Sequence, residues 1–246
     1  MATQTRDTGH NGAIGVLGGM GPLATAEFFK KLTLAISENG GAAGDAQHPR
    51  VIVDSDPSIP DRTAYVLGKG PDPLPAMTAA AKRLVQAGAT VCVLASITAH
   101  AYLDGLRTAV PCEFASAFDS LKARIERDYV GVGRVGVLAT TGTIKSGLFD
   151  RYLPNLRVHY SDDEAQERFV MEAVYGSNGI KAGNVSEEPR HLLRQAAARL
   201  VARGAELIIV ACAEMSLVLS PADVEVPLVD PMQFLVEDLA TRFRIA

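Results

Sequence analysis

The sequence predicts an α/β fold of two similar lobes, each a parallel sheet flanked by helices. Three observations support this prediction. Short apolar runs alternate with longer amphipathic segments along the chain, which is the order of strand–helix–strand units with right-handed crossovers. The runs are continuous rather than alternating, as in parallel strands buried on both faces. One helix–strand unit also recurs later in the chain at a fixed spacing.

Five apolar runs, rich in valine, isoleucine and leucine, are the expected strands. They cover Ile14–Leu17, Val51–Val53, Val91–Ala95, Val135–Ala139 and Leu207–Ala211. The longer segments between them are amphipathic with helical spacing. These expected helices include Ala24–Ser37, Leu74–Gln86 and Pro189–Arg203. The segment 54–75, rich in proline and glycine, is expected to be a loop and is a candidate lid.

The recurring unit relates residues 83–96 to residues 199–212. The first copy reads RLVQAGATVCVLAS and the second RLVARGAELIIVAC, at an offset of 116 residues. Two helix–turn–strand units can look alike by chance, but the same offset also relates later positions and therefore favours a duplication. We predict a first lobe of residues 1–117 plus 229–246 and a second lobe of residues 118–228. Ser96 and Cys212 then stand at equivalent strand ends, where open α/β sheets bind ligands.

Composition and charge exclude several classes of protein. With 48% hydrophobic residues the chain can bury a large core, and 24 basic against 28 acidic residues leave a net charge of −4. A general nucleic-acid or acidic-membrane binder would need a basic surplus. Three cysteines are too few for a disulfide scaffold, so we expect reduced thiols in a cytoplasmic protein. The first dozen residues lack the apolar stretch of a signal peptide, and no apolar run has the length of a membrane span.

A glycine-rich turn, Gly18–Ala24, follows the first expected strand and opens a helix. It fits the pattern G-x-G-x-x-A of dinucleotide sites, but Asp54 and Asp56 lie 35 and 37 residues beyond Gly19, where a nucleotide site needs an acidic residue after about 20. The turn offers backbone donors and the positive end of a helix, which suit a carboxylate. A tight turn without a ligand is the alternative.

Six segments in order along the chain carry a resemblance to a known family. They are residues 14–27 (IGVLGGMGPLATAE), 57–63 (PSIPDRT), 98–100 (TAH), 138–144 (LATTGTI), 181–184 (KAGN) and 226–231 (VPLVDP). On these segments the sequence resembles the cofactor-independent aspartate/glutamate racemase superfamily, and within it the aspartate racemases. The resemblance implies two lobes about a pseudo-two-fold axis, a homodimer, and inversion at the α-carbon of an acidic amino acid. It implies neither pyridoxal phosphate nor a metal.

The resemblance also implies the site residues. The family's strand-end motifs Cys-Asn-Thr-Ala and Cys-Thr-Glu correspond to Ser96-Ile-Thr-Ala and Cys212-Ala-Glu, so one of the two cysteines that flank the substrate is a serine here. Cys212 and Ser96 are the implied catalytic pair for proton transfer on opposite faces of the substrate. The implied substrate-binding residues are Gly19, Met20, Arg62, Ile97, Thr98, Thr141, Lys181, Ala213 and Glu214. No metal ligands are implied.

These departures leave three functions open. A serine hydroxyl needs an adjacent base to replace a thiol, and His100 is the nearest candidate, whereas Ser96 is alternatively a helix N-cap. Asp56 either pairs with Arg62 or repels a carboxylate. The chain is then a racemase or epimerase of an aspartate-like acid, a single-cysteine decarboxylase or isomerase of a related small carboxylic acid, or a non-catalytic protein that binds a small acid.

Overall fold

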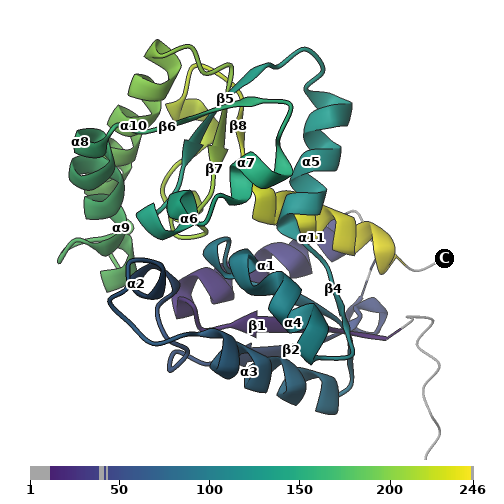
Figure 1. Ribbon diagram of the computed structural model, residues 1–246. Coiled ribbons are helices and arrows are strands. Elements are labelled where there is room, and N and C mark those ends of the chain that lie inside the picture. Colours follow the sequence, from purple (N-terminus) through teal and green to yellow (C-terminus); the bar gives the residue numbers. More distant parts are fainter. Residues whose placement is uncertain (1–11, 39–41, 43, 245–246) are drawn as a thin grey trace, which may run out of the picture.

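The computed structural model contains two four-stranded parallel sheets with the same strand order (Figure 1). It describes residues 12–38, 42 and 44–244. The strands are β1 (Ala13–Gly18), β2 (Arg50–Ser55), β3 (Ala89–Leu94), β4 (Glu113–Phe114), β5 (Arg134–Leu138), β6 (Arg157–Tyr160), β7 (Leu207–Val210) and β8 (Leu228–Val229). The sheets have the orders β2-β1-β3-β4 and β6-β5-β7-β8, which confirms the predicted α/β fold of two similar lobes.

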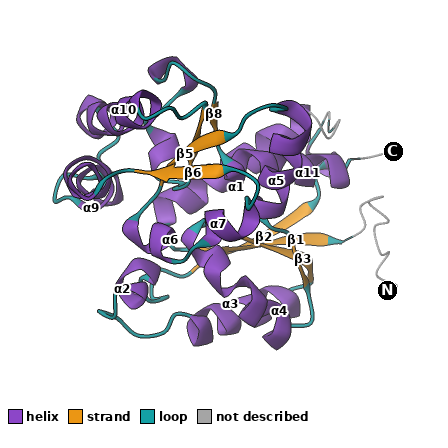
Figure 2. Ribbon diagram, turned by 45° about the horizontal axis from the view of Figure 1, so that its top comes forward, coloured by secondary structure: helices purple, strands orange, loops and turns teal. Residues whose placement is uncertain are grey.

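Helices flank both sheets, as Figure 2 shows. They are α1 (Pro22–Glu38), α2 (Arg62–Val66), α3 (Leu74–Gln86), α4 (Leu103–Ala109), α5 (Ala117–Asp128), α6 (Thr141–Lys145), α7 (Leu148–Tyr152), α8 (Asp163–Ala165), α9 (Glu172–Tyr175), α10 (Glu187–Ala202) and α11 (Pro231–Arg242). The predicted helix Leu74–Gln86 has the predicted bounds. The segment expected to be a loop after β2 contains α2, whose first turn is capped by the Asp61 side chain.

The predicted strands match the inner strands of both sheets, and the differences lie at the edges. β4, β6 and β8 were not predicted because edge strands are short and partly exposed, so they lack a continuous apolar run. β2 was predicted, but as a strand buried on both faces. It is an edge strand, and its Val53 side chain is exposed.

One apolar core joins the two lobes on the side where the C-terminal helix returns. α11 packs against both α1 and α5, and it lies between these two helices in Figure 1. The apolar cluster around it includes Ile14 of β1, Val135 of β5 and Phe234 of α11, all buried. Two further clusters belong to one lobe each. The lobe boundaries at residues 117 and 228 stay a prediction.

Two sequence expectations concern the ends of the chain and membranes. The polar N-terminal stretch that we expect to lack a signal peptide covers residues 1–12, and residues 1–11 of it lie outside the described residues. Within the described ranges, no helix combines the length and the hydropathy that a membrane crossing requires.

At the strand-end side the lobes meet where α6 of the second lobe packs against α2 of the first. A Cβ added to Gly142 would lie 2.5 Å from Thr63 Oγ1 and 2.6 Å from Thr63 Cα. Because Thr63 Cα is a backbone atom, a side chain at position 142 fits only if α6 and α2 move apart. Glycine at position 142 therefore allows α6 to approach α2 this closely.

We expect Gly142→Ala to destabilise the protein by roughly 1–3 kcal/mol, because the added methyl group overpacks the contact with Thr63. Urea unfolding monitored by circular dichroism measures this free energy. Gly44→Ala is the matched control, since an added Cβ there meets no described atom within 4 Å. Equal unfolding midpoints for the two variants would contradict this interpretation of the interface.

Candidate active site

Two connected cavities lie where the strand ends of the two lobes face each other. Ser96 and Cys212 each stand two residues beyond the end of a central strand, β3 and β7, and both side chains line the smaller, inner cavity. Its lining comes from both lobes: Met20, Arg62, Thr63, Ser96, Ile97, Thr98, Thr140, Tyr175, Lys181, Cys212, Ala213 and Glu214. The inner cavity has a volume of only 10 Å³, about the space of one water molecule.

The outer cavity has a volume of 300 Å³ and adjoins the inner one. Four residues, Met20, Arg62, Lys181 and Glu214, line both cavities and form the border between them. Gly19 lines the outer cavity at the turn after β1, with a φ of +83° and with Asp56 backbone atoms 2.3–2.4 Å from the position of a Cβ. Only glycine fits this turn. Any ligand that reaches Ser96 and Cys212 through the outer cavity passes the four border residues.

A chain of polar contacts connects Cys212 to the border. The Cys212 thiol donates to Glu214 Oε2 at 3.2 Å, and Lys181 Nζ donates to Glu214 Oε1 at 2.9 Å. Burial raises the pKa of Cys212 well above its usual value, the negative charge of Glu214 raises it further, and Lys181 lowers it. The thiol is therefore protonated in this arrangement, and Glu214 is placed to accept its proton.

Arg62 is a buried cation without a carboxylate partner. It is 6% exposed, its Nη1 donates to the Pro60 carbonyl at 3.1 Å, and its Nη2 donates to the Met20 carbonyl. Its Nε has no hydrogen-bond partner, and no carboxylate of the described residues forms an ion pair with it. A buried charge is costly unless it is paired. Arg62 is therefore the strongest candidate for binding an anionic ligand.

The acidic residues nearest Arg62 in sequence are directed elsewhere. Asp56 accepts from Arg83 at 3.0 Å, so the suggested Asp56–Arg62 pair does not form. Asp61 caps α2 with one carboxylate oxygen and accepts from the Tyr175 hydroxyl with the other. The positive charge of Arg62 thus remains available at the border.

The Ser96 hydroxyl has no base beside it. Ser96 is buried, and its hydroxyl has no hydrogen-bond partner within the described part of the chain. The following 3-10 turn, Thr98–Tyr102, has no side-chain cap, so the N-cap role is wrong. His100 Nε2 accepts from the Ala117 amide at 3.1 Å, so Nδ1 carries the proton and donates to the Ser96 carbonyl at 2.9 Å. Burial lowers the pKa of His100 to about 4, and both ring nitrogens are engaged.

Hydroxyl groups line the contact between the lobes at the inner cavity. Thr98 and Thr143 hydroxyls are 2.6 Å apart across the contact, and those of Thr63 and Thr140 are 3.5 Å apart. Sequence reasoning missed Thr63, Thr140 and Tyr175 as lining residues. Both threonines lie inside segments that carry the family resemblance, so that signal was available. Tyr175 lies in a helix with no local signal.

The remaining predicted residues differ in where they lie. Ile97, Thr98 and Ala213 line the inner cavity, so an apolar isoleucine and a methyl group stand at two positions where the resemblance implies amide and hydroxyl groups. Thr141 lines neither cavity. Its hydroxyl accepts from Gln166 Nε2 at 3.3 Å, which ties the start of α6 to the neighbouring helix. No cluster of three or more potential metal ligands occurs among the described side chains.

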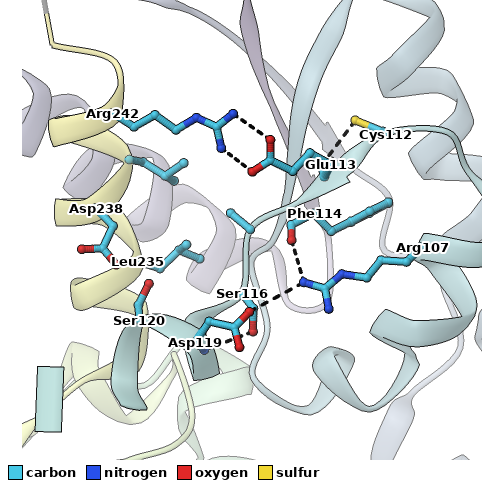
Figure 3. A pocket seen from close by; sticks show the side chains of 12 residues that line it. Arg107, Cys112, Glu113, Phe114, Ser116, Asp119, Ser120, Leu235, Asp238 and Arg242 are labelled. Atoms are coloured by element: carbon cyan, nitrogen blue, oxygen red, sulfur yellow. Dashed lines mark hydrogen bonds and ion pairs between the residues drawn. The ribbon is translucent and has the colours of Figure 1, made fainter. Parts of the chain in front are cut away.

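A cleft of 610 Å³ lies elsewhere, between β4, α5 and α11 (Figure 3). Its two arginines are already paired. Arg242 forms a two-pronged ion pair with Glu113, and Arg107 donates to the Phe114 carbonyl at 2.9 Å. The cleft is larger than the cavities at the strand ends, but its arginines are paired and its thiol, Cys112, donates to backbone carbonyls rather than to a carboxylate. The chemistry therefore points to the strand-end cavities.

Comparison with known proteins defines the class to which this architecture belongs. Residues 17–239 match the family model described as Asp/Glu/Hydantoin racemase, and the chain belongs to that family. The chain is 23% identical over 233 residues to the broad specificity amino-acid racemase RacX of Bacillus subtilis, covering 94% of this chain and 97% of that protein.

Solved structures show the same fold. An aspartate racemase of Picrophilus torridus superposes with a TM-score of 0.77 at 23% identity, over 93% of this chain and 94% of that one. A glutamate racemase of Francisella tularensis, solved with D-glutamate, gives a TM-score of 0.67 at 18% identity, over 92% of this chain and 79% of that one. At these identities the likeness concerns the fold.

We expect Glu214→Gln to lower the pKa of Cys212, because it removes a negative charge that raises this pKa and leaves the Lys181 cation unneutralised. Lys181→Gln should raise the pKa. The pH dependence of Cys212 alkylation measures both shifts, in a background in which Cys92 and Cys112 are replaced by alanine. Identical pH profiles for the three proteins would show that the contacts of Glu214 do not control the thiol.

Proposed function

We propose that the protein is a cofactor-independent racemase or epimerase acting at the α-carbon of an acidic, aspartate-like amino acid. One observation carries the proposal: a buried thiol with an aligned proton acceptor, Cys212 with Glu214, lies beside the unpaired cation Arg62 at one cavity. Family membership and the name of the related amino-acid racemase support the same chemistry.

In the proposed reaction Cys212 first transfers its proton to Glu214. The resulting thiolate removes the α-proton, so the carbon–hydrogen bond breaks while a sulfur–hydrogen bond forms. The electron pair moves into the substrate carboxylate, and Arg62 stabilises the added negative charge. Ser96, or a water held by it, delivers a proton to the opposite face and regains one from solvent, while Glu214 releases to solvent the proton that it took from Cys212, so that the site returns to its starting state.

The predicted binding residues have distinct parts in this proposal. Arg62 binds the substrate carboxylate at the border between the cavities. Lys181 balances the charge of Glu214 at 2.9 Å, which reduces the repulsion between Glu214 and an anionic substrate. Gly19 and Met20 shape the turn over the outer cavity, while Ile97, Thr98 and Ala213 surround the reacting carbon. Thr141 acts indirectly, by holding α6.

The substrate class, the cofactors, the oligomeric state and the cellular location are proposed from the resemblance alone. We propose a small carboxylic or amino acid as the substrate, no pyridoxal phosphate or metal, a homodimer, and a cytoplasmic location. Neither nucleic acid nor a membrane is part of the proposal.

A second candidate function follows from the Ser96 hydroxyl, which has no base. A protonated Cys212 thiol on one face suits a reaction that creates a carbanion without removing a proton. In a decarboxylation the carbon–carbon bond of a substituted malonate breaks, carbon dioxide leaves, and Cys212 protonates the enediolate from one side. The product would be a single enantiomer, and solvent would return the proton to the thiol. A cis–trans isomerisation is the related alternative.

Incubation with L- or D-aspartate in deuterated water tests the racemase proposal, with NMR detection of α-hydrogen exchange. We expect exchange in the wild type and none in Cys212→Ala. Arg62→Met should lower kcat/KM roughly a hundred-fold, because it removes the charge that stabilises the carbanion. Arg107→Met, in the cleft of Figure 3, is the matched control and should leave the rate unchanged.

The same panel separates the alternatives. Absence of exchange from every acidic amino acid rejects the racemase, and carbon dioxide release from a substituted malonate with one product enantiomer then supports the second function. Ligand-induced thermal stabilisation with no turnover indicates a binding protein. Ser96→Cys should raise the exchange rate if the missing thiol limits the reaction. An unchanged exchange rate would indicate that Ile97 and Ala213, rather than the missing thiol, limit the reaction.

A further inference from the structure

We propose that the Tyr175 hydroxyl latches the two lobes over the inner cavity and that release of this latch controls access to Cys212. Tyr175 is a positioning residue in this account, since it holds the cavity closed and does not take part in proton transfer. The proposal goes beyond the proposed reaction and does not depend on it.

Tyr175 reaches from one lobe to the other at the inner cavity. It is the last residue of α9, and its hydroxyl donates to Asp61 Oδ2 at 3.2 Å and lies 3.3 Å from Thr63 Oγ1. Asp61 and Thr63 belong to the start of α2 in the first lobe. The Lys181 ammonium lies 5.3 Å from the centre of the Tyr175 ring. The side chain thus ties the α2 region to the border of the cavities.

The size of the inner cavity makes an opening motion necessary. Its volume of 10 Å³ holds about one water molecule, whereas an amino acid has several heavy atoms around its α-carbon. A substrate carbon can sit between Ser96 and Cys212 only if the strand ends move apart. Because β3 and β7 belong to different sheets, such a movement changes the spacing of the lobes and breaks no sheet hydrogen bonds.

The contacts between the lobes are distributed unevenly. On the side of α11 a continuous apolar core joins them, with residues such as Val135 and Phe234 buried. At the cavity they are joined by hydrogen bonds between side-chain hydroxyls, which contribute little net stability each. Opening therefore begins at the cavity, with the apolar core as the hinge.

Tyr175 differs from the other groups that join the lobes at the cavity. Its side chain is partly exposed, at 38%, whereas Thr63 and Thr140 are buried. Its partner Asp61 is a carboxylate, so this hydrogen bond, at 3.2 Å, has a charged acceptor, unlike those between two neutral hydroxyls. Although the residue is 38% exposed, desolvation of its hydroxyl raises the pKa of Tyr175, so the phenol is a protonated donor at neutral pH. The latch is thus the most exposed of these polar contacts and the one with a charged acceptor.

The alkylation rate of Cys212 by iodoacetamide, followed by peptide mass spectrometry, tests the latch without any substrate. Cys212 is buried, so its rate reports opening of the cavity. Tyr175→Phe keeps the ring beside Lys181 and removes only the hydroxyl. We expect the Cys212 rate to rise about five-fold, as for the loss of one hydrogen bond. Asp61→Asn, which retains a capping side chain for α2, should raise it less.

Controls within the same experiment distinguish the latch from general loosening. The partly exposed Cys112 lies in the cleft of Figure 3, and its rate should not change. Tyr65→Phe alters an equally exposed tyrosine of α2 and should leave the Cys212 rate at the wild-type value. The ratio of rates is measured at several pH values, because a shifted thiol pKa gives a ratio that varies with pH. An unchanged Cys212 rate in Tyr175→Phe, a parallel rise at Cys112, or a ratio that varies with pH would overturn the proposal.

Discussion

The whole site depends on one constraint of parallel sheets: the carboxyl ends of the strands lie at one edge. Each lobe has its central strand followed by a short reactive or polar segment at that edge, and the two edges face each other. Ser96 after β3 and Cys212 after β7 therefore line one cavity although 116 residues separate them. The apolar core around α11 and the close contact at Gly142 hold the lobes in this relation.

Charge is distributed unevenly around the two strand-end cavities. Lys181 is neutralised by Glu214, while Arg62 is buried and donates only to backbone carbonyls. A folded protein retains such an unpaired cation at a cost, which an anionic ligand would remove. The thiol side of the cavity thus has a carboxylate beside it and the border has an unpaired cation, whereas the Ser96 side has a hydroxyl without a base. This asymmetry between two otherwise equivalent strand ends distinguishes the chain from a symmetric two-thiol site.

The sequence predicted the features that repeat or that form continuous apolar runs. The offset of 116 residues predicted the equivalence of Ser96 and Cys212 because both copies end in the same helix–turn–strand pattern. Edge strands such as β6 escaped prediction, since partial exposure interrupts their apolar runs. Tyr175 and the Asp61 carboxylate meet only in three dimensions, and no local pattern encodes that contact. The engagement of both His100 ring nitrogens depends on the packing of α5 and was equally hidden.

The shared cavity is tested most directly by bridging its two sides. In Ser96→Cys, with Cys92 and Cys112 replaced by alanine, the new thiol should face Cys212 across the cavity. A short bis-electrophile such as 1,3-dichloroacetone should then join both thiols of one molecule, detected by mass spectrometry as a single bridge with no remaining free thiol. Two separate single-ended adducts, with no bridge at any reagent concentration, would contradict the account, since they would show that the strand ends do not share one cavity.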